Sequence, residues 1–169
     1  AYGIVKLSTC YATRTVCEKY GIRHIWTRVL SGYGKYDNEC SVLVANIVNS
    51  IKKRPLEFSK GEQIWDFVYM DDIANALYLL AKKEKSKGIY PIGSGEARPL
   101  KEYLRIMCKK LGEDVDAALG KIPYGENQTM YLEADISKLQ EDTGWMPQVT
   151  FEDGIQRVIE FYKSIDIYW

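Results

Sequence analysis

The first thirty residues place a helix, a glycine and a strand in direct succession, which restricts the chain to a small set of folds. The residue pattern predicts a helix over residues 2–20. Gly21 follows it, and glycine readily adopts the positive φ that ends a helix. Residues 22–30, Ile-Arg-His-Ile-Trp-Thr-Arg-Val-Leu, predict a buried strand. This order is typical of an α/β layer, in which helices pack on a parallel sheet.

The rest of the chain continues the alternation of helical and extended patterns. The further helices are expected over residues 41–53, 71–82, 100–111, 137–143 and 151–164. Extended segments are expected at 55–58 paired with 63–70, at 88–92 and at 129–132. Asp71 and Asp72 are expected to cap the third helix and to provide favourable negative charge in its first turn.

The segment after the first strand, residues 31–39, is a candidate binding region. It follows the carboxyl end of the strand, and open α/β sheets bind ligands at that edge. Gly32 and Gly34 lack side chains, so a bound group can approach the backbone closely.

Tyr2 and Lys6 form a candidate proton-transfer pair. Four residues apart on a helix, they lie on one face, one turn from each other. A neighbouring ammonium favours the charged form of a phenol. The same spacing recurs at Tyr78 and Lys82, in an ordinary amphipathic pattern. Spacing alone therefore does not identify a site.

Charge and composition exclude several classes of partner. Lys and Arg total 23, as do Asp and Glu, so no overall field would attract nucleic acid or an anionic membrane. No apolar stretch reaches the length of a membrane span, and no signal peptide is recognised. The four cysteines lack zinc-ligand spacing, and His24 is the only histidine, so no metal is expected. We interpret the chain as a reduced, cytoplasmic protein.

Six short motifs, in their order and spacing, together resemble the extended short-chain dehydrogenase/reductase family, in its nucleotide-sugar epimerase/dehydratase branch. The resemblance covers essentially the whole chain and aligns it with the C-terminal half of such an enzyme. It implies an α/β fold with a partial Rossmann-like, doubly wound sheet over residues 1–39. A small α/β substrate-binding domain would follow over 40–169, with some elements packing back on the sheet. The motifs are Tyr2-Gly3-x-x-Lys6, Thr27-Arg28 leading to Tyr33-Gly34, Trp65-Asp66-Phe67-Val68-Tyr69-Met70-Asp71-Asp72, Ile89-Tyr90-Pro91-Ile92-Gly93-Ser94-Gly95, Asp135-Ile136-Ser137-Lys138, and Gly144-Trp145-x-Pro147 with Phe151-Glu152-Asp153-Gly154-Ile155.

The resemblance also implies a mechanism. Tyr2 would act as general acid/base toward a sugar hydroxyl, assisted by Lys6, while NAD or NADP takes hydride from the same carbon. Tyr2 and Lys6 would also contact the cofactor. The backbone of Leu30 and Ser31, just past the strand, would face the nicotinamide.

The implied substrate contacts fall partly where the chain departs from the family pattern. Relatives usually carry asparagine where this chain has Ser31, and a nucleotide-binding arginine where it has Trp65. An indole can stack on a base, and structural burial of Trp65 is an equally good interpretation. Asn127 lies where relatives often contact the diphosphate or sugar. Ser31, Trp65 and Asn127 are therefore the candidate substrate contacts.

The family's glycine-rich phosphate loop has no counterpart in these 169 residues and is expected upstream. We therefore expect the isolated chain to be inactive and not to bind the cofactor alone, so its standing as an enzyme stays open. The alternative is a non-catalytic fragment or subunit that binds a nucleotide-sugar, or that forms a homodimer or associates with the missing N-terminal half. A third interpretation is a stand-alone α/β binding domain in which the Tyr2–Lys6 spacing is accidental.

Overall fold

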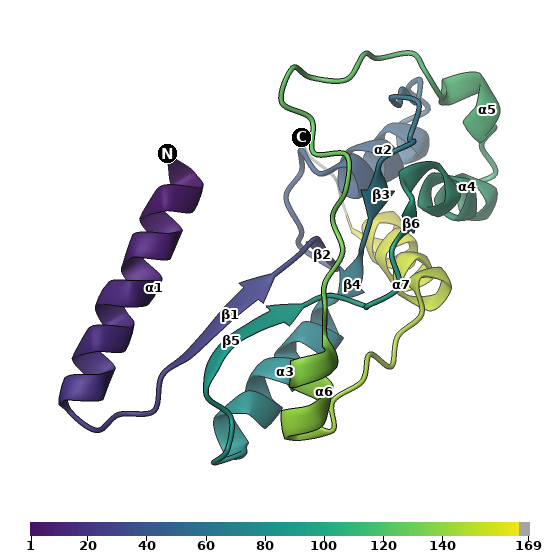
Figure 1. Ribbon diagram of the computed structural model, residues 1–169. Helices are drawn as coiled ribbons and strands as arrows, with labels where there is room; N and C mark the ends of the chain where they lie inside the picture. Colours follow the sequence, from purple (N-terminus) through teal and green to yellow (C-terminus); the bar gives the residue numbers. More distant parts are fainter. Residues whose placement is uncertain (166–169) are drawn as a thin grey trace.

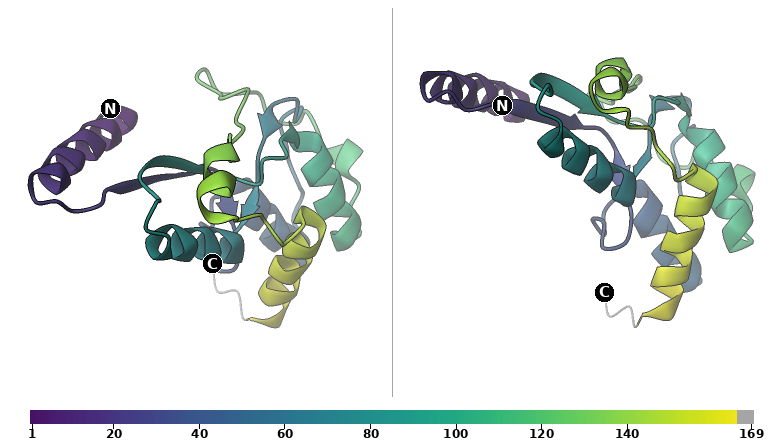
Figure 2. Two further views of the ribbon diagram at one scale, coloured as in Figure 1. Left: turned by 60° about the horizontal axis from the view of Figure 1, so that its bottom comes forward. Right: turned by 90° about the horizontal axis from the view of Figure 1, so that it is seen from below.

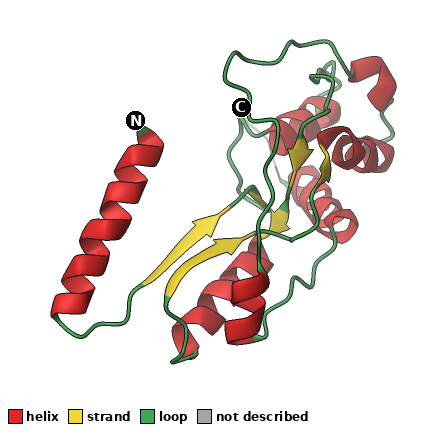
Figure 3. Cartoon of the chain, in the orientation of Figure 1, coloured by secondary structure: helices red, strands yellow, loops and turns green. Residues whose placement is uncertain are grey.

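A computed structural model describes residues 1–165, in which helices and strands alternate (Figure 1). The helices are α1 (Tyr2–Lys19), α2 (Val42–Ile51), α3 (Met70–Lys82), α4 (Leu100–Leu111), α5 (Val115–Ala118), α6 (Ser137–Thr143) and α7 (Phe151–Ser164). The strands are β1 (Ile25–Val29), β2 (Gly32–Tyr33), β3 (Ile64–Trp65), β4 (Val68–Tyr69), β5 (Gly88–Ile92) and β6 (Arg98–Pro99). Figure 3 shows how much of the chain between these elements is loop, above all between α5 and α6.

The strands form three short pairs. β1 and β5 are parallel, with Ile25 opposite Gly88 and Val29 opposite Ile92. β2 and β4 are also parallel, whereas β3 and β6 are antiparallel. Parallel strands need long crossover connections, and α2 and α3 lie in the segment that joins β1 to β5. The predicted α/β class is therefore what the chain adopts.

Two hydrophobic cores hold these elements together. The first lies among α2, α4 and α7 and contains a group of aromatic rings; Phe151, for example, has its ring centroid 4.6 Å from that of Tyr103. Burial raises the pKa of the Tyr103 hydroxyl, which therefore stays neutral. The second core joins β5, α3 and α6 around the buried Tyr90 and Trp145. The Trp145 indole N–H donates to the backbone carbonyl of Asp72 at 3.1 Å, which ties the chain after α6 to the start of α3.

Helix α1 lies at one end of the molecule, beside β1 and away from the other helices (Figures 1 and 2). Of its residues only Cys10 is buried, while the side chains of Tyr2 and Ile4 are 78% and 72% exposed. The helix ends as predicted, with Gly21 at φ +64° just beyond it. The predicted strand forms over residues 25–29, but the expectation that it is buried is wrong, because β1 contains no buried residue. Ile25 at the start of β1 packs only partly against the second core, and the other residues of the strand are half-buried or exposed.

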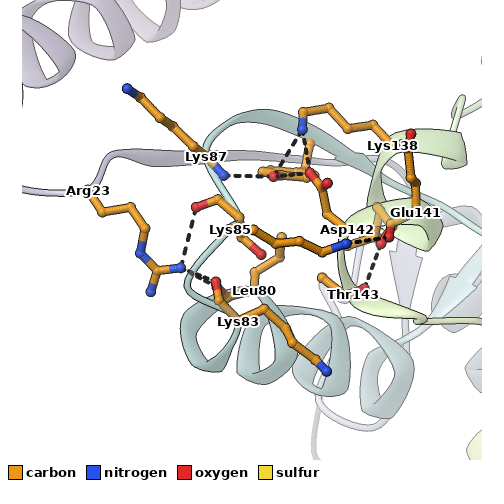
Figure 4. A network of polar contacts seen from close by, with 12 residues as sticks. Arg23, Leu80, Lys83, Lys85, Lys87, Lys138, Glu141, Asp142 and Thr143 are labelled. Carbon is orange, nitrogen blue, oxygen red and sulfur yellow. Dashed lines mark hydrogen bonds and ion pairs between the residues drawn. The ribbon is translucent and has the colours of Figure 1, made fainter.

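Arg23, in the segment that joins α1 to β1, binds this segment to the end of α3. The Arg23 guanidinium donates to carbonyls at the carboxyl end of α3 and in the following turn, among them Leu80 at 3.2 Å and Lys83 (Figure 4). Cations stabilise helix carboxyl ends because the last carbonyls have no partner within the helix. On the other side of this turn, the Lys85 ammonium donates to the carbonyl of Glu141 at 3.0 Å, which fastens α6.

Three predictions about local structure need correction. Residues 55–58 form no strand, and β3 pairs instead with β6 and, by one bridge, with Tyr131. Residues 129–132 therefore contribute this single bridge and not a strand. Neither Asp71 nor Asp72 caps α3, whose N-cap residue is Tyr69, although both lie in its first turn as predicted. The Asp72 carboxylate accepts instead from the backbone N–H groups of Gln148 and Val149, at 3.0 Å each. The long-range partners of β3 and Asp72 outweighed the local patterns.

Candidate functional site

A groove between the first turns of α1 and the strand β1 contains the Tyr2–Lys6 pair. The groove has a volume of about 620 Å³ and is lined by Tyr2, Gly3, Lys6 and Leu7 on the helix and by residues 26–29 on the strand. The Lys6 ammonium lies 5.5 Å from the centroid of the Tyr2 ring. Both polar groups are therefore available to a molecule in the groove.

The second pair with the same spacing provides an internal comparison. On α3 the Lys82 ammonium lies 5.6 Å from the Tyr78 ring centroid, and the Tyr78 side chain is 60% exposed. The geometry within the two pairs is thus nearly the same. What distinguishes Tyr2 and Lys6 is the strand beside them, which forms the other wall of the groove.

The carboxyl end of β1 leads from this groove to a second cavity. Leu30 donates its N–H to the carbonyl of Ile92 at 2.9 Å, and the carbonyl of Ser31 accepts from the N–H of Val68 at 3.3 Å. These bonds fix both residues at the ends of β4 and β5. Val29 lines the groove and Ser31 lines the cavity, so only Leu30 separates the two along the chain.

The cavity has a volume of about 420 Å³, within the roughly 300–1,000 Å³ range of small-molecule sites. Ser31 and Trp65 both line it. Trp65 is partly buried and also packs against the first core, so it has a structural role as well. Asn127 lies in the exposed loop between α5 and α6 and is not on the lining, whereas Ile122, Pro123 and Gln128 of the same loop are.

Gln63 lines the same cavity and was not among the predicted site residues. Its side chain is 5% exposed, and its carbonyl oxygen Oε1 has no hydrogen-bond partner among residues 1–165. Alternate residues of an extended segment face the same side. The prediction that Trp65 lines a binding site therefore also implied that Gln63, two positions earlier, lines it. Buried polar groups without partners are rare, which makes this amide a candidate ligand contact.

Asp66, next to Trp65, anchors this wall of the cavity. It is fully buried, and its carboxylate accepts from the N–H and hydroxyl of Ser94 at 2.6 Å each, from Gly95 N–H at 3.2 Å and from Ala134 N–H at 3.0 Å. One side chain thereby joins the start of β4, the loop after β5 and the chain before α6. We assign Asp66 a structural role in keeping Trp65 in place.

Residues 1–165 contain neither a metal-binding cluster nor a membrane-spanning helix. No group of three or more His, Cys, Asp or Glu side chains in this range is arranged to hold a metal ion. None of the helices in the same range is both long and apolar enough to cross a lipid bilayer.

Comparison with protein families identifies the chain. The profile described as the NAD dependent epimerase/dehydratase family matches residues 1–93, more than half of the sequence. The chain belongs to this family. The matched range includes the groove, β1 and most of the cavity wall, and the family is the one that the six motifs resemble.

Curated members of the NAD-dependent epimerase/dehydratase family match nearly the whole chain but are longer. A dTDP-glucose 4,6-dehydratase of Escherichia coli is 30% identical over 179 residues, which covers 99% of this chain and 49% of that protein. A putative UDP-glucose 4-epimerase of Methanocaldococcus jannaschii is 33% identical over 149 residues, covering 86% of this chain and 47% of that protein. The chain spans about half the length of the curated relatives it matches.

Solved structures of the family confirm the fold. UDP-glucose 4-epimerase of Thermotoga maritima, solved with UDP-glucose, superposes with a TM-score of 0.86 at 24% identity, covering 96% of this chain and 53% of that one. DesIV, a dTDP-glucose 4,6-dehydratase of Streptomyces venezuelae, gives a TM-score of 0.84 at 24% identity, covering 96% and 51%. The prediction of a partial Rossmann-like α/β structure is therefore confirmed.

Proposed function

We propose that this chain carries the Tyr2–Lys6 pair and the substrate-binding part of an NAD(P)-dependent nucleotide-sugar epimerase, dehydratase or reductase. The observation that supports this most is the position of the pair. Tyr2 and Lys6 line a groove whose other wall, β1, continues within two residues into the 420 Å³ cavity lined by Ser31 and Trp65. A reacting centre and a binding site for the rest of the substrate are thus adjacent.

In this proposal Tyr2 exchanges a proton with a sugar hydroxyl. Its phenol is exposed in the groove, so a hydroxyl can reach it, and general acid–base catalysis of this kind contributes about 10²–10⁴-fold. The Lys6 ammonium, one helical turn away, stabilises the phenolate that remains after the proton has left. Because both side chains project from the same face of α1, they reach a ligand in the groove together.

The nicotinamide end of the cofactor fits the donors in the groove. Tyr2 and Lys6 supply a hydroxyl and an ammonium that can bind ribose oxygens, and the backbone near Leu30 and Ser31 lies at the end of the groove. When bound, NAD or NADP would accept a hydride from the sugar and return it. Within residues 1–169 no glycine-rich phosphate loop is found, so we propose that the chain alone neither binds the cofactor stably nor catalyses turnover.

The substrate is proposed to be a nucleoside diphosphate sugar, since the matched relatives are named for dTDP-glucose and UDP-glucose. Ser31 and Trp65 are its proposed contacts, while Asn127, away from the cavity lining, stays a prediction. We further propose that residues 1–39 belong to the Rossmann-like domain and 40–169 to the substrate-binding domain, with 166–169 outside the described residues. The packing of β5 and α3 beside β1 fits later elements that return to the sheet.

A second candidate function, association with another polypeptide, is favoured by the exposure of α1. Apolar side chains at Tyr2, Ile4, Val5, Tyr11 and Val16 are all more than half exposed. Within residues 1–165, β1 pairs only with β5, so its other edge has unpaired backbone groups. We propose that a second copy or the N-terminal half of such an enzyme covers this surface. Light scattering after size exclusion tests self-association, and a clean monomer at high concentration would count against it.

The proposed reaction is tested on the polypeptide at the length its source organism makes. It is incubated with NAD⁺ and either UDP-glucose or dTDP-glucose, and the products are identified by NMR. We expect a 4-epimer, a 4-keto-6-deoxy sugar or an oxidised sugar from one of the two substrates. No change in either substrate, with cofactor binding verified, would contradict the proposal. In parallel, the 169-residue chain alone should show no turnover.

A further inference from the structure

A cluster of charged side chains lies at the opposite end of β1 from Leu30 and Ser31. It surrounds a cavity of about 600 Å³ between the carboxyl end of α1, the segment that leads into β1 and the turn from α3 to β5. The lining contains four cationic side chains and two carboxylates, although the charges of the whole chain balance. They are Arg14, Arg23, Lys85 and Lys87, against Glu18 and Glu84.

The charge of Arg23 is held in place without being neutralised. Its Nη1 and Nη2 groups donate to backbone carbonyls, those of Leu80 at 3.2 Å, Ala81 at 2.6 Å, Ser86 at 3.3 Å and Lys83. Among residues 1–165 no carboxylate oxygen lies within 4.0 Å of this guanidinium, and its Nε–H has no partner. A cation whose position is already fixed loses little conformational entropy when it binds an anion.

Two further cations reach the cavity from different elements. On α1 the Arg14 guanidinium uses its Nε–H for the exposed carboxylate of Glu18, at 2.9 Å, and has further N–H groups available. Just before β5, Lys87 extends its side chain to the same side of the turn as Arg23, whereas the Lys85 ammonium points away, toward α6 (Figure 4). In the part of the chain that the structure describes, the Lys87 ammonium has no carboxylate within 4.0 Å. Cations on two separate elements are therefore available to one ligand.

His24 adds a ring nitrogen to the same lining. Its Nε2 lies 3.0 Å from the hydroxyl oxygen of Thr13, whose hydrogen is directed to the carbonyls of Thr9 and Cys10, at 2.8 and 3.1 Å. The Nε2 atom therefore carries a hydrogen and donates it to Thr13, and Nδ1 has no partner within the described residues. Because His24 is the only histidine in these 169 residues, its imidazole is a specific reporter of the cavity.

We propose that this cavity binds a compact anion with two or more phosphate-type groups, held by Arg14, Arg23 and Lys87. Arginine and lysine are the side chains that most often bind phosphate, and the volume lies within the roughly 300–1,000 Å³ range of small-molecule sites. Because Arg14 belongs to α1 and Lys87 to the turn before β5, the ligand links these two elements. It thereby fixes the position of α1, the helix that carries Tyr2 and Lys6.

Inorganic pyrophosphate is the probe, added to the polypeptide at the length its source organism makes. NAD⁺ and UDP are present in excess, so that the proposed cofactor and substrate sites are occupied. At constant ionic strength, pyrophosphate should shift the NMR resonances of the His24 imidazole, which are assigned with His24→Gln. The affinity should fall severalfold when the ionic strength is raised from about 0.05 to 0.3 M, because exposed charges are then screened. Unchanged His24 resonances at millimolar pyrophosphate would overturn the inference.

Variants of single charges separate the cavity from the overall charge of the protein. Lys87→Gln should weaken pyrophosphate binding about fivefold, the upper end of the effect of an exposed ion pair, whereas Glu84→Gln should strengthen it. Lys109→Gln makes the same change of charge at an exposed position of α4, away from the lining, and should alter binding by less than about twofold. Equal weakening by Lys87→Gln and Lys109→Gln would mean that overall charge governs binding, and would refute the site.

Hydrogen exchange tests whether the ligand links α1 to the turn. Pyrophosphate should slow amide exchange in residues 14–24 of the wild type, and Arg14→Gln should lose most of this protection. The substitution removes an exposed side chain whose ion pair contributes at most about fivefold to helix stability, so the variant is expected to fold. Pyrophosphate that binds without slowing exchange in this segment would contradict the link. The assay of nucleotide-sugar turnover decides the proposed function separately, because none of these measurements depends on catalysis.

Discussion

Replacing Asp66 by alanine should destabilise the chain severely. The carboxylate accepts four hydrogen bonds at 2.6–3.2 Å from two separate segments, and it is fully buried. Leaving a buried donor without a partner costs about 1–3 kcal/mol. Ala134 is only 4% exposed, so its N–H would lose its hydrogen-bond partner, and the N–H of the half-buried Ser94 would do so in part. The Ser94 hydroxyl and the N–H of the exposed Gly95 can bind water instead. We therefore expect Asp66→Ala to lower the free energy of unfolding by roughly 3–5 kcal/mol.

Urea denaturation followed by circular dichroism measures this loss, and Asp71→Ala is the matched control. Asp71 has a 75% exposed side chain and a single ion pair at 4.0 Å, with Arg157. Exposed pairs contribute at most about 1 kcal/mol, so Asp71→Ala should change the free energy of unfolding by less than that. A loss for Asp66→Ala no larger than for Asp71→Ala would refute the view that this carboxylate holds the cavity wall.

Three further predictions concern single groups. Gly154→Ala should lower the melting temperature, because a Cβ there would overlap a buried tyrosine, while Gly3→Ala, with no neighbour within 4 Å, should leave it unchanged or raise it. Burial raises the pKa of the Cys108 thiol to about 11, so alkylation monitored by mass spectrometry should modify the exposed Cys40 first and reach Cys108 only on unfolding. Hydrogen bonds from a lysine and a tyrosine lower the pKa of Asp142, so its stabilising contribution should be present above about pH 4 and be lost as the pH falls through the lowered value. Asp142→Asn should remove that part of the acid dependence in urea titrations at several pH values.

Within residues 1–165, six of the seven helices were predictable because their signals are local, whereas the four-residue α5 was not expected. α4 covers residues 100–111 as expected, and Gly112 after it has φ +78°. Likewise α7 begins after Thr150, whose side chain accepts from the N–H of Asp153 and caps the helix. Each of these signals lies within a few residues of the helix end that it determines.

The strands and the cavity were less predictable because distant residues determine them. The two-residue strand β3 pairs with β6 and, by one bridge, with Tyr131. No residue pattern near position 64 predicts either partner. Ser31 and Trp65 reach the cavity because each adjoins a strand end. Asn127 lies in a loop without periodicity, and no local pattern indicates that its exposed neighbour Gln128 borders the cavity instead.

The roles of Tyr2 and Lys6 are the central claim, and the second pair on α3 allows a controlled test of it. The measurement is kcat for the natural-length polypeptide with Tyr2→Phe and, separately, with Tyr78→Phe, each compared with wild type. Tyr78 has the same spacing to a lysine and nearly the same cation–ring distance, 5.6 Å against 5.5 Å. We predict that Tyr2→Phe lowers kcat by about 10²–10⁴-fold and that Tyr78→Phe changes it by less than about twofold. Equal effects of the two substitutions, or full activity of Tyr2→Phe, would contradict the account.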